Sequence, residues 1–164
     1  MSELNAKEYE KVMYHETGHL LFALKDEYVD KATIFISFNN KYGSLGATTH
    51  SKLLKEFDGI QNFHLIFNAI KGKVAGNIAE EVFLGGANIN NSYDDYRTLY
   101  EQEKVWIEKH FPTYRFDDVL NNAIIEVRNY FENNKDEFFK LLNEVKQGKW
   151  CKNFSLYVGR NKLY

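Results

Sequence analysis

The chain of 164 residues is poor in the residue types that cross-link or interrupt a fold. It has one cysteine, Cys151, so it forms no internal disulfide and offers no set of thiolates for a structural zinc site. This cysteine usage is typical of a protein from a reducing compartment. It has one proline, Pro112, so long helices can form over most of its length.

Long apolar runs and a strong net charge are missing as well. No apolar run approaches the roughly 20 residues needed to cross a bilayer, and the first residues are polar and charged, unlike a signal peptide. The formal net charge of −2 gives no indication of a nucleic-acid-binding surface. We therefore expect a cytoplasmic protein with no membrane span and no nucleic-acid partner. The length fits one domain, residues 1–149, followed by a C-terminal tail, residues 150–164.

Helical periodicity is what the sequence does have. Apolar residues recur every three or four positions over residues 6–25, 60–84 and 116–147, which predicts three helices. Gly85-Gly86 is expected to end the second, and Asn133-Asn134 is a possible break in the third. A further helix is expected over residues 91–110, where Ser92 and Asp95 have the spacing of a capping box.

A short β segment is predicted between the first two helices. Residues 32–38 (Ala-Thr-Ile-Phe-Ile-Ser-Phe) are rich in β-branched and aromatic side chains and are typical of a strand. Turn-forming residues follow at 39–43, and residues 44–50 are expected to return as a second strand. The predicted fold class is therefore mainly α with a small β-hairpin, an α+β arrangement.

The segment His15-Glu16-Thr17-Gly18-His19 lies within the first predicted helix. Four residues of helix turn through about 400°, so the two imidazoles lie about 40° apart and one turn from each other, as two ligands of a tetrahedral zinc require. Glu16 projects between them and can reach a metal-bound water without being a ligand. The spacing predicts two metal ligands and a general base; an ordinary helix with two core-facing histidines is the alternative.

Two glutamates on the second predicted helix are also of interest. Glu81 lies about 20° from Ile70 on the apolar stripe, whereas Glu80 lies off it. A carboxylate on a buried face needs a partner. Glu81 is therefore interpreted as paired within the core or as part of a functional site, and the structural pairing is favoured.

In this order, the segments resemble the peptidase domain of the FtsH-type ATP-dependent zinc proteases across residues 7–147. The matching stretches are residues 14–19 (Tyr-His-Glu-Thr-Gly-His), 44–48 (Ser-Leu-Gly-Ala-Thr), 76–85 (Gly-Asn-Ile-Ala-Glu-Glu-Val-Phe-Leu-Gly) and 91–96 (Asn-Ser-Tyr-Asp-Asp-Tyr). The resemblance implies an FtsH-peptidase-like zincin helical domain, here without an ATPase module.

The resemblance also implies a ligand set. One Zn²⁺ per chain is expected on His15, His19 and an aspartate that aligns with Asp95. The chain has a tyrosine where the family has an apolar residue after this aspartate. Asp94 and a carboxylate of the Glu80-Glu81 pair therefore stay as alternative ligands; otherwise Glu80 or Glu81 is expected to orient a ligand imidazole.

Together these features predict a zinc-dependent endopeptidase that hydrolyses peptide bonds in unfolded or peptide substrates through a zinc-bound water, with Glu16 as general base. The second strand is expected to pair with an extended substrate, although a plain structural hairpin is an equal alternative. The candidate residues of this edge are Ser44, Leu45, Gly46, Ala47 and Thr48.

The predicted partners and the alternative function follow from what the chain lacks relative to this family. It has no G-x-x-x-x-G-K-[ST] phosphate loop, so a separate ATPase is a possible partner. A homo-oligomer is also possible, because the family works as rings. The alternative function is a catalytically weak or inactive peptidase-like module that binds or regulates a partner.

Overall fold

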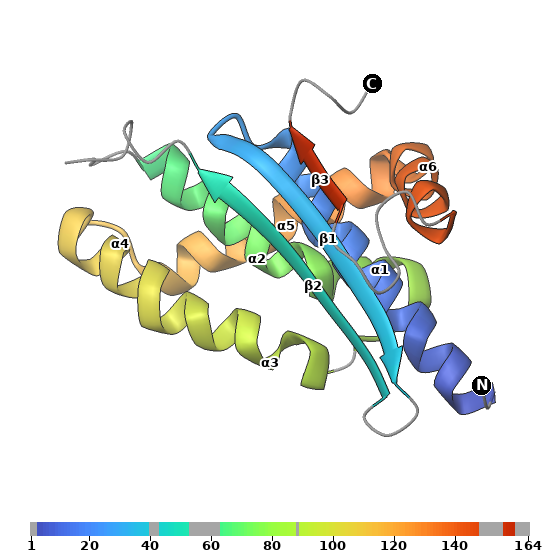
Figure 1. Cartoon of the computed structure of the whole chain (residues 1–164). Helices are drawn as coiled ribbons and strands as arrows, with labels where there is room; N and C mark the ends of the chain where they lie inside the picture. The colour runs from blue at the N-terminus through green and yellow to red at the C-terminus, as the bar shows by residue number, and fades with distance from the viewer. Residues whose placement is uncertain (1–2, 40–42, 53–62, 88, 148–155, 160–164) are drawn as a thin grey trace.

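The computed structural model describes residues 3–39, 43–52, 63–87, 89–147 and 156–159 (Figure 1). This part of the chain is mainly helical, as the periodicity predicts. The elements are α1 (Glu3–Lys25), β1 (Val29–Asn39), β2 (Gly43–Lys52), α2 (Phe63–Leu84), α3 (Ile89–Thr98), the π-helical turn η2 (Leu99–Glu103), α4 (Lys104–His110), α5 (Phe116–Asn133), α6 (Lys135–Lys146) and β3 (Leu156–Gly159). The predicted turn at 40–42, the first residues of the helix predicted from Ile60, and tail residues 150–155 and 160–164 lie outside the described residues.

The two long helices α1 and α2 pack against each other and form the centre of the molecule. In Figure 1 the sheet passes in front of them, while α5 lies behind α2. The sheet contacts α1 through β1 and β2, α5 contacts α2, and α6 contacts α1. The largest fully buried side chains come from all of these helices: Leu20, Ile70, Ile78, Phe131 and Phe138. Both faces of the α1–α2 pair are therefore covered, and side chains between the two helices are shielded from water.

Small residues allow α1 and α2 to approach closely. A Cβ atom added at Gly18 would lie 2.5 Å from the carbonyl oxygen of Ala75 and 2.8 Å from the Cβ atom of Ala79. Ala75 and Ala79 are themselves fully buried. Because only hydrogen fits at position 18, the backbone of α2 comes within reach of the side chains that α1 carries on the neighbouring turns.

The sheet has the strand order β2-β1-β3, with β1 antiparallel to both neighbours. In its register, Ile34 of β1 lies opposite Thr48 of β2 and Leu156 of β3. Ala32 and Ile34, two residues apart on β1, are buried, as expected for one face of a strand packed on a helix. Part of the predicted C-terminal tail thus pairs with β1, and within the described residues β2 has a neighbouring strand on one side only.

The helix ends agree with some sequence signals and correct another. Gly85 follows the last residue of α2 with φ of +74°, the left-handed conformation that terminates helices. The helix predicted over 116–147 is divided into α5 and α6 at Asn134. The capping box at Ser92 is wrong: α3 begins earlier, at Ile89, so Ser92 lies inside the helix. None of the helices described here is both long and apolar enough to cross a bilayer.

Candidate metal centre

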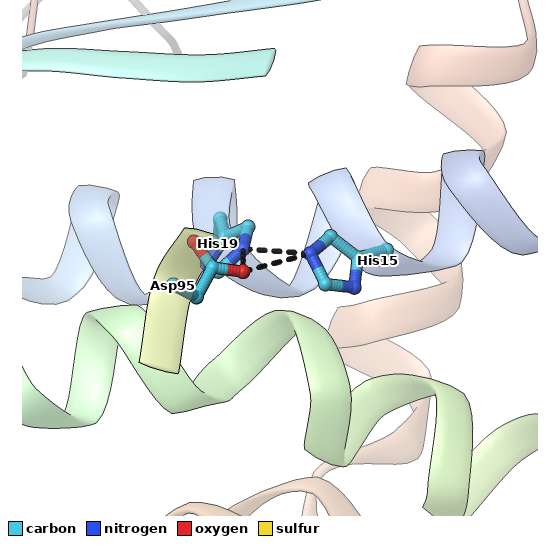
Figure 2. Close-up of side chains that lie close together, drawn as sticks. All are labelled: His15, His19 and Asp95. Carbon is cyan, nitrogen blue, oxygen red and sulfur yellow. Dashed lines mark hydrogen bonds and ion pairs between the residues drawn. The ribbon is translucent and has the colours of Figure 1, made fainter. Parts of the chain in front are cut away.

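Three side chains from α1 and α3 converge on one point (Figure 2). The Nε2 atoms of His15 and His19 lie 3.0 Å apart, and Oδ2 of Asp95 lies 3.1 Å from each of them. The two imidazoles are one helical turn apart on α1, as their spacing predicts. Asp95 joins them from α3, 80 residues further along the chain than His15.

Each imidazole is oriented by a hydrogen bond at its other nitrogen. Nδ1 of His19 lies 2.7 Å from the backbone carbonyl oxygen of Gly72. A carbonyl oxygen only accepts, so this Nδ1 carries the hydrogen and donates it. Nδ1 of His15 donates in the same way to Oε1 of Glu80, 2.7 Å away, and Glu80 is fully buried. When each ring is neutral its hydrogen is on Nδ1, and the lone pairs of the two Nε2 atoms point at the space shared with Asp95.

The geometry and chemistry of these three atoms fit a divalent metal ion. Two bare ring nitrogens and a carboxylate oxygen at 3.0–3.1 Å repel one another unless a proton or a metal cation lies among them. A tetrahedral zinc with bonds of about 2.0–2.1 Å keeps its ligand atoms about 3.3 Å apart, close to this triangle. Two imidazoles and one carboxylate suit zinc and several other first-row ions.

The electrostatics of the site reflect the same convergence. Burial lowers the pKa of His15, but its hydrogen bonds to Asp95 and Glu80 and the charge of Glu16 outweigh burial and raise this pKa to about 9. Burial raises the pKa of the Asp95 carboxyl group, whereas the two imidazoles hold it well below its usual range. A proton therefore stabilises the three atoms when no ion is bound, and a binding metal ion must displace it.

The site is closed at one end and open at the other. The side chain of His15 is 3% exposed, that of His19 is 13% exposed, and that of Asp95 is 26% exposed. Solvent therefore reaches the site more readily at Asp95 and His19 than at His15. Three candidate ligands with one approachable side would match the pattern of catalytic rather than structural zinc sites.

Gly76 of α2 lies directly against the two imidazoles. A Cβ atom added there would lie 2.5 Å from Nε2 of His19 and 2.7 Å from Nε2 of His15. The sequence placed Gly76 in a motif but did not predict its contact with the imidazoles, and it did not single out Gly72, whose carbonyl binds His19. The available signal was two glycines four residues apart inside a helix, where glycine costs about 1 kcal/mol relative to alanine and indicates a close approach.

The helical wheel placed Glu81 rather than Glu80 near the buried face of α2, and the structure shows the reverse, although one glutamate of the pair does bind an imidazole as expected. Glu80 is fully buried and binds His15, whereas the side chain of Glu81 is 37% exposed. The prediction was wrong because the buried face of α2 also includes small residues, among them Ala75 and Ala79, that add little to an apolar stripe. Glu81 has no described contact with the histidines.

The remaining predicted residues are placed as follows. Glu16 is buried, and its charge contributes to the raised pKa of His15. The side chain of Asp94 is 81% exposed and forms an ion pair with Arg97, away from the histidines. Residues 44–48 lie in β2 and pair with β1 at one end of the strand order, and β2 also contacts α1, the helix that carries both histidines.

The sequence matches no protein-family model, and no curated protein is significantly similar to it. The resemblance to FtsH-type peptidases therefore depends on the quoted motifs alone. The cluster of His15, His19 and Asp95 is a donor set found in several kinds of zinc hydrolase. The cluster therefore indicates that a metal ion could bind here, and it does not by itself indicate a particular family.

Proposed function

We propose that this protein is a zinc-dependent endopeptidase of the FtsH-peptidase type, with one zinc ion held by His15, His19 and Asp95. One observation carries the proposal: the three donor atoms lie 3.0–3.1 Å apart while both histidines already donate from Nδ1. Such a triangle needs a cation among its atoms: a proton on His15 serves in the metal-free protein, and a divalent ion fits the same place.

The residues around the ion have separate tasks in this proposal. Zinc, when bound, acidifies a water molecule and polarises the scissile carbonyl group. Glu16 serves as the general base, accepting the proton of the attacking water and returning it to the leaving amine. Glu80 and the carbonyl of Gly72 hold the two imidazoles in the tautomer that leaves Nε2 available.

The position of β2 supports the proposed substrate class. An extended peptide can pair with the backbone of residues 44–48 on the side of β2 where the described sheet has no further strand. Main-chain pairing selects for an extended backbone more than for particular side chains. Unfolded proteins and peptides are therefore the proposed substrates.

The test combines metal analysis with cleavage of fluorescein-labelled casein, an unfolded protein. Purified protein is expected to contain about one zinc per chain. Glu16→Gln keeps the size of the side chain, so it should retain zinc and lose cleavage by about 10²-fold or more, the usual contribution of a general base. His15→Ala should lose both zinc and cleavage. Casein cleavage that persists in zinc-loaded Glu16→Gln would refute the mechanism, and a well-folded wild type without affinity for zinc would refute the site.

A second candidate is a peptidase-like module that binds or regulates a partner without cleaving it. It is favoured by the burial of Glu16, which is 6% exposed although a general base must reach the substrate. The same experiment separates the two functions. Zinc-loaded wild type that binds labelled casein and leaves it intact would support the binding module.

A further inference from the structure

A chain of polar side chains connects α3 to the rest of the molecule close to the metal centre. The hydroxyl group of Ser92 donates to Oδ1 of Asn77 at 2.8 Å, and Nδ2 of Asn77 donates to Oε1 of Glu81 at 3.0 Å. Nη2 of Arg128 donates to the other oxygen of Glu81 at 2.5 Å. The chain runs from α3 through α2 to α5, and it ties the helix that carries Asp95 to two others.

Ser92 is well placed to control the position of Asp95. The two residues are three apart on α3 and so lie on the same face of the helix. Between Ser92 and Thr98, Ser92 is the one buried residue of α3, at 3% exposed. Tyr96 also packs against the hydrophobic core but is only partly buried, so the Ser92 hydrogen bond is a main contact of this part of α3. Its acceptor, Asn77, directly follows Gly76, the residue beneath the two imidazoles.

We propose that Ser92, Asn77 and Glu81 are positioning residues that hold the Asp95 carboxylate at the two imidazoles and thereby set the affinity of the metal site. This inference rests on the proposed zinc site. A metal ligand is effective only when its donor atom is held within about 0.5 Å of the required place, and partners of the ligands commonly change metal affinity by 10–100-fold. Here none of the three residues is proposed to touch the Asp95 carboxylate. They act on it by holding α3, the helix that carries Asp95, against α2.

Loss of the Ser92 bond is not expected to detach the segment that follows α3. In η2, Leu99 is fully buried. Nζ of Lys73 on α2 also donates to Gln102 at 3.1 Å and to Glu103 at 2.8 Å. These contacts hold the end of α3, so removal of the Ser92 hydroxyl should loosen the turn that carries Asp95 without unfolding the helix.

The experiment measures zinc affinity of the full chain by competition with a chromophoric chelator, with circular dichroism as the check on folding. Ser92→Ala is expected to weaken zinc binding by about 10-fold. Thr98→Ala is the matched control, because it also removes a hydroxyl group from α3. That hydroxyl donates within the helix, to the backbone carbonyl of Asp95 at 3.0 Å, and so does not tie α3 to α2. This control should bind zinc within about 2-fold of wild type.

A double-mutant cycle separates positioning from general destabilisation. In an Asp95→Ala background, Ser92→Ala should have no further effect on zinc affinity, because no carboxylate remains to be positioned. Asn77→Ala should reproduce the loss seen in Ser92→Ala and add nothing to it, because both substitutions break the same bond.

Two results would overturn the inference while leaving the zinc site intact: wild-type affinity in both Ser92→Ala and Asn77→Ala, or an equal loss from Ser92→Ala with and without Asp95. A wild-type chain that binds no zinc would overturn the proposed function and this inference together.

Discussion

Substitution of Gly76 by alanine tests the arrangement of α2 against the two imidazoles. The added Cβ atom would lie 2.5 Å from Nε2 of His19 and 2.7 Å from Nε2 of His15. The closer contact is about 1 Å shorter than the roughly 3.5 Å of an ordinary van der Waals contact. At least one ring must therefore move.

Movement of either ring costs free energy, because each ring also donates a hydrogen bond from its Nδ1 atom. His15 donates to buried Glu80 and His19 donates to the carbonyl of Gly72, each at 2.7 Å. A displaced ring keeps neither its hydrogen bond nor its place in the ligand triangle. We expect zinc affinity to fall by about 100-fold or more, the upper end of the range for residues that support metal ligands. At 1.4 kcal/mol per tenfold, this is about 3 kcal/mol of binding free energy.

The matched control is Gly72→Ala, one turn earlier on the same helix. A Cβ atom at Gly72 meets nothing within 4 Å, and the carbonyl that binds His19 is unchanged by the substitution. This variant should keep zinc affinity and gain about 0.5–1 kcal/mol in the free energy of unfolding, because alanine is the better helix former. Chelator competition measures the affinity, and urea denaturation of metal-free protein measures stability. Wild-type affinity in Gly76→Ala, or the same loss in both variants, would refute the reasoning.

Three further outcomes are expected. Gly18→Ala should lower the free energy of unfolding, measured in urea, by about 1–3 kcal/mol through overpacking. The added Cβ atom would lie 2.5 Å from the backbone oxygen of Ala75. Unchanged stability would contradict the close packing of α1 on α2. Glu80→Gln should reduce zinc affinity in a chelator competition by about 10-fold, and wild-type affinity would show that this bond does not orient His15. The pKa of His15 is raised from 6.5 to about 9, so below that value the metal-free ring holds a proton. Calorimetry near neutral pH in two buffers of different ionisation enthalpy should therefore show about one proton released per zinc. The apparent zinc affinity should rise about tenfold per pH unit until the pH reaches the raised pKa of His15. Zinc binding without proton release would contradict this prediction.

By itself the sequence determined the features that depend on local geometry. The two histidines of α1 face the same point because four residues make slightly more than one helical turn, whatever surrounds them. Gly85 ends α2 because glycine adopts a positive φ without strain, and the helix predicted through Asn133-Asn134 does break there. The mainly helical class was predictable as well, because a helix repeats every 3.6 residues and so gives a recognisable spacing of apolar residues.

Tertiary structure decided which distant groups meet those histidines. Asp95 reaches them, and exposed Asp94 does not, because of how α3 docks on α2. Glu80 is the buried glutamate, since α2 packs on α1 through glycine and alanine, which carry too little apolar signal for a helical wheel to find. Local spacing sets the angle between side chains on one helix, but the docking of several helices sets which faces touch. In this protein that docking depends on glycine and alanine residues, which add little to an apolar pattern.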